Sequence, residues 1–351
     1  MSLAETPVTA PTLPAPEPES AVSRDRRRWG RHALAYLLTA FVLVSLNFFL
    51  PRALPGDPVA ALAGGAGVGR GSVEVSEADR AELRRYYGLD RPLINQYGRY
   101  LGGLARGDLG DSIRYHVPVR RLVAERLKWS LLLVGAAMAL ATGLGMVAGI
   151  HSGWRRDRGV DRGLLGLLVG VGNFPVYVIA SLALIAFGVK LRWFPIAGAQ
   201  TPFTDYGLLR RAADVAHHLV LPASVMALQF LFLLYLVMRG SMVSEAGSDH
   251  LLLGRVKGLR ERRLKYRYAA RNALLPVVTV VAVDIGVAVG ATVFVERVFA
   301  YPGLGRLMFE SIDFRDYPTM QGCFLVIAMV VLAVNLATDL LYPRLDPTVR
   351  R

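Results

Sequence analysis

Long apolar runs constrain the fold of this chain more than any other feature. Six of them interrupt its 351 residues, at about 33–50, 130–150, 164–187, 219–238, 275–295 and 322–342. A helix rises about 1.5 Å per residue, so each run can cross a hydrocarbon core about 30 Å thick. Helices are expected, because an unpaired backbone group in lipid costs several kcal/mol. The runs predict an all-α polytopic membrane protein with six transmembrane helices.

The composition narrows the class of protein further. Charged residues make up 19% of the chain, against about 25% in soluble domains. The net charge is +14, and we expect the excess Lys and Arg in cytosolic loops and near anionic lipid headgroups. Binding of a nucleic acid is not expected, because no basic stretch alternates with stacking aromatic residues. The single cysteine, Cys323, excludes an internal disulfide and a multi-cysteine metal site. No Gly-Lys pair occurs, which excludes a phosphate-binding P-loop, and no cofactor is expected.

The distribution of Lys and Arg predicts the orientation. With the N-terminus inside, the cytosolic segments carry five Lys/Arg before the first run, four at 155–162, nine at 239–271 and three after the last run. Short cytosolic loops are enriched in these residues, whereas loops longer than about sixty residues cross regardless of charge. We therefore expect both termini in the cytosol and the long 51–129 loop on the extracytoplasmic side.

Two further segments flank or interrupt the membrane domain. Residues 1–30 are rich in Pro, Ala and Glu and then in Arg, and we expect a disordered cytosolic tail there, with the membrane domain over 31–351. The 51–129 loop contains a Gly-rich stretch at 64–71, a charged helical pattern at 77–87 and an aromatic and apolar face at 97–104. This loop is expected to form a small extracytoplasmic cap.

The 239–274 segment between the fourth and fifth runs is longer and more basic than a connector requires. Its Lys/Arg residues supply charge for an acidic or polar groove on a cytosolic partner. Gly258 removes a side chain where two helical pieces turn or where a partner backbone approaches. The alternative is an ordinary positive-inside loop with no partner.

A series of short motifs adds a family resemblance over about residues 31–351. The chain resembles the permease subunits of bacterial binding-protein-dependent ABC importers, in the dipeptide, oligopeptide and nickel branch. The motifs that carry the resemblance are LPGDP at 54–58, YGLDRPL at 87–93, GDLGDS at 107–112, RVKGL at 255–259, RNALLP at 271–276, VERVFAYPGLG at 295–305, RDYP at 315–318 and LDP at 345–347. The resemblance implies a type I importer permease fold.

The resemblance also implies a function and its partners. Such a permease pairs with a second permease to form the pathway for ATP-driven uptake of di- or oligopeptides. Two ABC ATPase subunits hydrolyse the ATP, so the chain itself is not expected to be an enzyme, and an extracytoplasmic binding protein delivers the substrate. The same machinery importing nickel or another small solute remains open. The apolar runs by themselves also fit a polytopic membrane enzyme or a secondary transporter.

In such permeases the 239–274 loop forms a short coupling helix that docks in a cleft of the ATPase. The residues carried over to this role are Asp249, Arg255, Lys257, Gly258, Leu259, Arg262, Asn272 and Pro276. Pro276 either opens a helix at its first turn or kinks a helix that has already begun. Gly254 departs from the family pattern, which has Ala there, and a helical Gly costs up to about 1 kcal/mol.

Four residues are candidates for the pathway and its outer mouth. Asp284 lies near the middle of the fifth run, where an ionisable group is costly and is a functional candidate. The alternatives are an interhelical hydrogen bond or a protonated carboxyl. Glu296, Pro302 and Gly303 lie just after that run. They either receive substrate at the outer mouth or only shape the turn.

Overall fold

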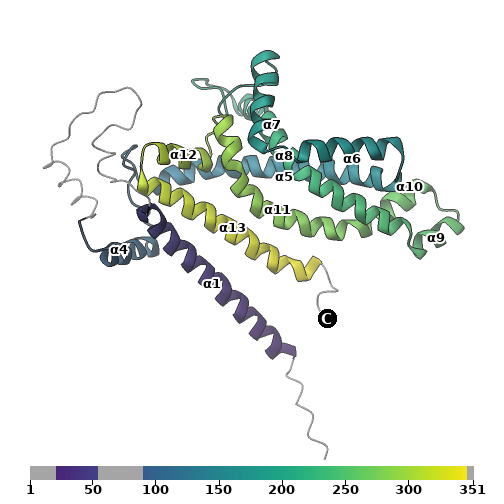
Figure 1. The fold of residues 1–351 in the computed structure, drawn as a ribbon, viewed down its shortest axis with the longest axis horizontal. Coiled ribbons are helices and arrows are strands. Elements are labelled where there is room, and N and C mark those ends of the chain that lie inside the picture. The colour runs from purple at the N-terminus through teal and green to yellow at the C-terminus, as the bar shows by residue number, and fades with distance from the viewer. Residues whose placement is uncertain (1–20, 54–89, 346–351) are drawn as a thin grey trace, which may run out of the picture. The chain divides into compact units, whose positions relative to one another are not determined.

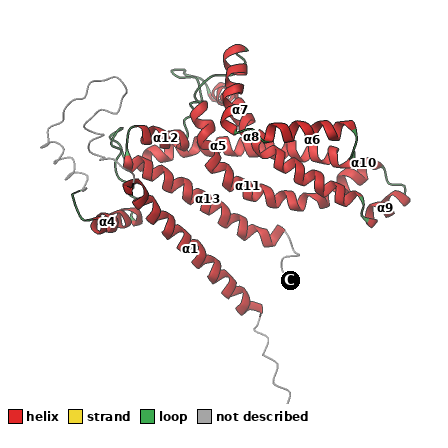
Figure 2. Ribbon diagram, in the orientation of Figure 1, coloured by secondary structure: helices red, strands yellow, loops and turns green. Residues whose placement is uncertain are grey.

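The computed structural model describes residues 21–53 and 90–345, and the side chains of 33–49 and 90–340. The expectations for residues 1–20, the 54–58 motif, the Gly-rich stretch, the charged 77–87 helix and residues 346–351 lie outside the described residues. All regular structure in the described ranges is helical, and the one β contact there is an isolated bridge between Asp111 and Pro118 (Figure 2). This agrees with the expected all-α class.

The chain divides into two compact units, Met1–Val42 and Leu43–Arg351. Figure 1 labels most of the helices in chain order. They are α1 (Ala21–Ala53), α4 (Leu93–Ala105), α5 (Val119–Trp154), α6 (Gly159–Gly172), α7 (Val176–Ala183), the π-helix η1 (Leu184–Lys190), α8 (Leu208–Ala246), α9 (Asp249–Val256), α10 (Glu261–Arg263), the π-helix η2 (Leu264–Ala269), α11 (Ala270–Val298), α12 (Leu304–Asp313) and α13 (Tyr317–Leu345).

Four helices in the described ranges are long and apolar enough to cross a membrane: Val119–Trp154, Leu208–Ala246, Glu261–Val298 and Tyr317–Leu340. The third apolar run does not form one continuous helix. It is broken into α6 and the α7–η1 pair, which meet at an angle of 100° and count as a fifth span only if taken together. Pro175 lies at this break and has no N–H to continue the helix. The first run forms a shorter apolar helix, Ala33–Phe49.

Two helices begin earlier than expected. Helix α1 begins at Ala21, within the segment 1–30 where a disordered tail was expected; Arg, frequent there, is a good helix former. Helix α5 begins at Val119, so the last residues of the expected 51–129 loop are already helical. Pro118 stands directly before α5 and no Pro or Gly interrupts 119–129, which explains the earlier start.

The core of the second unit is the packing of α5 along α8. Three glycines at four-residue spacing, Gly145, Gly149 and Gly153, bring the two backbones together. A Cβ at Gly149 would lie 2.6 Å from the Cβ of Met238, and a Cβ at Gly153 would lie 2.6 Å from the Cβ of Met242. Small residues at this spacing allow close helix packing in membranes. Helix α11 then packs against α5, α8 and α13.

The aromatic face at 97–104 forms part of α4. Tyr97 and Tyr100 pack around Phe48, with ring centroids 5.2 and 5.3 Å from that ring. The Asn47 side-chain amide donates to the Tyr100 hydroxyl at 3.0 Å and to the Gln321 carbonyl at 3.0 Å. These contacts join α4 to residues 47–48 of α1 and to the beginning of α13.

Candidate functional site

The basic loop after α8 contains the turn expected at Gly258. Helix α9 ends there in a Schellman motif, in which the Leu259 N–H donates to the Gly254 carbonyl at 3.1 Å and the Gly258 N–H donates to the Arg255 carbonyl at 2.9 Å. Gly258 has φ 72°, a left-handed conformation that favours glycine. The turn separates α9 from α10, so Gly258 lies where two helical pieces change direction.

The departure at Gly254 has a physical reason. Gly254 is buried, and a Cβ there would lie 2.6 Å from the Cδ2 of Leu264. Leu264 is 1% exposed and begins η2, on the other side of the turn. The Leu264 side chain therefore occupies the space that an alanine methyl would need, and it packs α9 against η2.

Helix α9 buries one side of its apolar surface and leaves the rest uncovered. Leu251 is fully buried, whereas Leu252, Leu253 and Val256 are 60%, 54% and 78% exposed. Asp249 lies in the first turn of α9, where a carboxylate interacts favourably with the helix dipole. The described part of the chain thus leaves an apolar face of α9 open to a partner.

Basic side chains lie on α9 and in the segment that follows it. Arg255 forms an ion pair with Glu261 at 3.8 Å, and its guanidinium lies 5.9 Å from the centroid of the Trp154 ring. Lys257 caps the C-terminus of α9 and is exposed. The side chains that follow line an open groove of about 460 Å³: Arg260, Arg262, Arg263, Tyr266 and Arg267. The groove is cationic, which suits an acidic or polar surface.

The two ends of the loop meet at Asn272. Its side-chain amide donates to the Glu245 carboxylate at 3.3 Å, and His250 Nε2 lies 3.3 Å from the same carboxylate. Pro276 lies inside α11, which begins at Ala270, so this proline stands within a helix that has already begun. Asn272 and Pro276 therefore lie on the same helix, at the base of the loop.

Asp284 lies in the middle of α11 and is 7% exposed. Its Oδ2 atom is buried and has no hydrogen-bond partner among the described residues. That oxygen does not form the interhelical hydrogen bond that was one of the two alternatives. The carboxyl group is thus buried, and its Oδ2 atom accepts no hydrogen bond from the described residues.

Glu296 and Gly303 form one structural unit at the other end of α11. The Glu296 carboxylate is fully buried and accepts from Ser130 Oγ at 2.6 Å, from the Gly305 N–H at 2.7 Å and from the Arg306 N–H at 3.1 Å. It thereby caps the N-terminus of α12, where free N–H groups and the helix dipole favour a negative charge. A Cβ at Gly303 would overlap this carboxylate. Pro302 lies in the same turn, so this geometry favours the turn-shaping interpretation.

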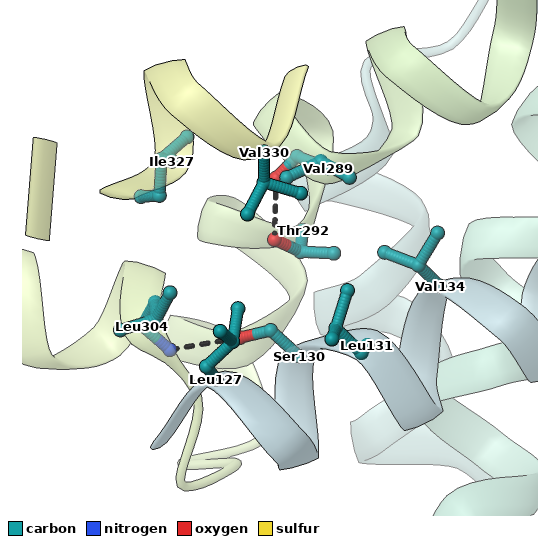
Figure 3. A pocket seen from close by; sticks show the side chains of 9 residues that line it. All are labelled: Leu127, Ser130, Leu131, Val134, Val289, Thr292, Leu304, Ile327 and Val330. Carbon is teal, nitrogen blue, oxygen red and sulfur yellow. Dashed lines mark hydrogen bonds between the residues drawn. The ribbon is translucent and has the colours of Figure 1, made fainter. Parts of the chain in front are cut away.

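Figure 3 shows a small pocket beside this unit. Ser130 Oγ also accepts from the Leu304 N–H at 2.8 Å, and Thr292 Oγ1 donates to the Val289 carbonyl at 2.9 Å. The other lining side chains are apolar. The cavity volume is about 10 Å³, and about this much room holds one water molecule. The pocket is too small to be a substrate site.

Two further buried carboxylates, Asp316 and Asp161, were not among the site residues predicted from the sequence. Asp316 accepts from Ser112 Oγ at 2.5 Å and from Thr319 Oγ1 at 2.8 Å, which joins the 107–112 and 315–318 motifs. Asp161 pairs with Arg239 at 2.7 Å. The only sequence signal for Asp316 was its position in the RDYP motif. Asp161 gave no signal, because its partner is 78 residues away.

Comparisons with known proteins agree with the resemblance. Residues 141–351 match the family model described as the binding-protein-dependent transport system inner membrane component. A protein of Brucella suis biovar 1 (strain 1330), provisionally named a peptide permease, is 38% identical over 319 residues, which cover 90% of this chain and 96% of that protein.

Two further relatives carry more specific names. The oligopeptide transport system permease protein AppB of Bacillus subtilis (strain 168) is 33% identical over 310 residues, covering 87% of this chain and 93% of its own. The dipeptide transport system permease protein DppB of Escherichia coli (strain K12) is 31% identical over 335 residues, covering 90% of this chain and 97% of its own. The similarity therefore extends along nearly the whole of each relative.

Proposed function

Because this chain belongs to the family of binding-protein-dependent transport system inner membrane components, we propose that it is one of two permease subunits that together form an import pathway. A member of this family is a transport permease and not an enzyme. It is a multi-pass protein of the inner membrane. ATP hydrolysis is assigned to two partner ABC ATPase subunits, and substrate delivery to an extracytoplasmic binding protein.

The topology proposed has six spans and both termini in the cytosol. The four long apolar helices, the bent α6 to η1 segment and the Ala33–Phe49 helix supply the six. The concentration of Lys/Arg at 239–271 supports a cytosolic position for α9, α10 and η2. It follows that Glu296, α12 and the buried Asp316 lie toward the extracytoplasmic side.

The observation that carries the coupling function is the uncovered apolar face of α9. Leu252, Leu253 and Val256 are exposed on α9, and the basic side chains at 260–267 that follow line an open cationic groove. An apolar centre with a charged rim is the composition of a protein interface. We assign this face to the ATPase cleft. Gly258 sets the angle between α9 and α10, and Asn272 closes the base of the loop.

The substrates proposed are di- and oligopeptides, because two of the relatives are named for these substrates. Asp284 is proposed to face the pathway, where its open acceptor can meet the amino group of a peptide or another cation. Glu296, Pro302 and Gly303 are proposed to hold the shape of the outer mouth. Uptake of nickel or another small solute by the same machinery is the alternative outcome of the test.

The test is reconstitution of the chain in proteoliposomes with a second permease, ATPases and a binding protein from the same genome. We expect ATP-dependent accumulation of labelled di- or tripeptides, and none with an ATPase subunit that cannot hydrolyse ATP. Accumulation of Ni²⁺ without peptide uptake would move the assignment to the alternative substrate. Uptake that does not depend on ATPase subunits would contradict the importer assignment.

A further inference from the structure

A buried ion pair joins α6 to α8. Arg239 Nε lies 2.7 Å from Asp161 Oδ1, and Arg239 Nη2 donates to Asp161 Oδ2 at 2.7 Å. The Asp161 side chain is 2% exposed and that of Arg239 is 21% exposed. This bidentate arrangement fixes the direction of the contact as well as its distance, because a guanidinium presents its donors in a rigid fork.

Neighbouring groups complete the coordination of the Asp161 carboxylate. Ser152 Oγ donates to Oδ1, and the Asp157 N–H donates to Oδ2 at 2.9 Å. Ser152 Oγ also lies 2.7 Å from the Tyr235 hydroxyl, which extends the network along α8. Each carboxylate oxygen thus has two donors. A buried charge is retained at low cost only when its acceptors are satisfied in this way.

Helix α6 has few other attachments to the core. Among its residues only Asp161 and Leu168 are buried, and Val160 and Leu167 are each 61% exposed. At its far end, a Cβ on Gly172 would lie 2.8 Å from the ring of Phe232 of α8. The carboxylate network is therefore the polar attachment that positions the first turns of α6 on α8.

Arg239 is also close along the chain to α9, the helix proposed to dock on the ATPase. It lies seven residues before the end of α8 at Ala246, and only Gly247 and Ser248 separate α8 from α9. A displacement imposed on α9 reaches Arg239 through about two turns of continuous helix. Coupling between distant sites passes through such rigid elements and ion-pair networks.

We propose that Asp161 and Arg239 are a positioning pair that makes α6, the first half of the bent third span, follow α8 when the coupling loop moves. This role rests on the proposed function of the loop. The pair contacts neither the ATPase face nor the pathway residue Asp284. Through this pair, a movement of α8 also moves α6.

The transport test compares Asp161→Asn, Arg239→Gln and the apolar pair Asp161→Leu/Arg239→Met in the reconstituted complex. The apolar pair removes the directional ion pair and leaves no unpaired buried charge, so it guards against simple unfolding. We expect its melting temperature to stay near wild type while substrate uptake per ATP hydrolysed falls about tenfold. Asp313→Asn, which breaks an exposed 3.3 Å pair with Arg297, is the matched control and should change neither value. Unchanged uptake per ATP in the apolar pair would overturn the proposal.

A second readout does not depend on transport. The variant Leu165→Cys is made in a Cys323→Ala background. Leu165 of α6 is half-buried, so labelling of the new thiol reports whether α6 stays packed against the core. We expect Asp161→Asn to raise its rate of maleimide labelling in membranes several-fold, and Asp313→Asn to leave it unchanged. Equal labelling with and without Asp161→Asn would overturn the positioning role. If the wild-type complex takes up no peptide, the proposed function fails, and labelling alone then decides the role of the pair.

Discussion

A methyl group on Gly254 would need the space that the Leu264 side chain fills, in the segment between α8 and α11. A Cβ on Gly254 would lie 2.6 Å from Leu264 Cδ2, and the two residues lie on opposite sides of the Gly258 turn. The packing of α9 against η2 therefore depends on a missing methyl group in one helix and a branched side chain in the other. A change at either position alters the angle at which α9 leaves the membrane domain.

The first prediction concerns Gly254→Ala. Alanine favours a helix over glycine by about 1 kcal/mol, but overpacking costs about 1–3 kcal/mol, so the single substitution should lower both stability and uptake. Adding Leu264→Val removes the clashing Cδ atom and should recover most of the loss. Thermal unfolding of the purified complex and ATP-dependent uptake measure both effects. A stable and active Gly254→Ala variant would show that the loop repacks freely.

The second prediction concerns Gly258. Among the residues that the structure describes, no atom lies within 4 Å of a Cβ built there, so any cost comes from φ 72° and not from crowding. Gly258→Val should uncouple the ATPase and abolish uptake, whereas Gly258→Asn should retain much of it, because Asn tolerates the left-handed region. Gly240→Ala is the control, since Gly240 is equally open but lies in regular helix. Equal loss in the Val and Asn variants would indicate that a partner, and not the backbone angle, requires glycine.

The third prediction separates shape from substrate contact at the outer turn. Ser130→Ala removes the donor to Glu296 and the acceptor of the Leu304 N–H, which should cost about 1–3 kcal/mol. If these residues shape the turn, the melting temperature falls while the concentration of loaded binding protein that gives half-maximal uptake stays constant. Thr319→Ala, which removes a donor to Asp316, should behave in the same way. A changed half-maximal concentration at unchanged stability would instead place Ser130 in substrate reception.

The sequence was a good guide to local features and a poor one to long-range contacts. The apolar runs and Gly258 were predictable, because hydropathy and backbone conformation are properties of short segments. The Asp161–Arg239 pair joins residues 78 positions apart, and nothing in either segment marks the other. The 100° break at Pro175 was hidden by hydropathy, which does not distinguish one apolar helix from two. The reason for Gly254 required the position of Leu264 in space.

The last prediction concerns Asp284. Its buried Oδ2 has no hydrogen-bond partner among the described residues, and an unsatisfied buried acceptor costs about 1–3 kcal/mol. Asp284→Leu should therefore raise the melting temperature of the complex, while peptide uptake falls if the carboxylate faces the pathway. Asp284→Asn keeps the size and should lower uptake of peptides with a free amino terminus more than uptake of N-acetylated peptides. Asp313→Asn, at an exposed carboxylate, should change neither stability nor this ratio. Full uptake by Asp284→Leu at raised stability would show that Asp284 does not line the pathway. Its carboxylate would then be a buried group that only lowers stability.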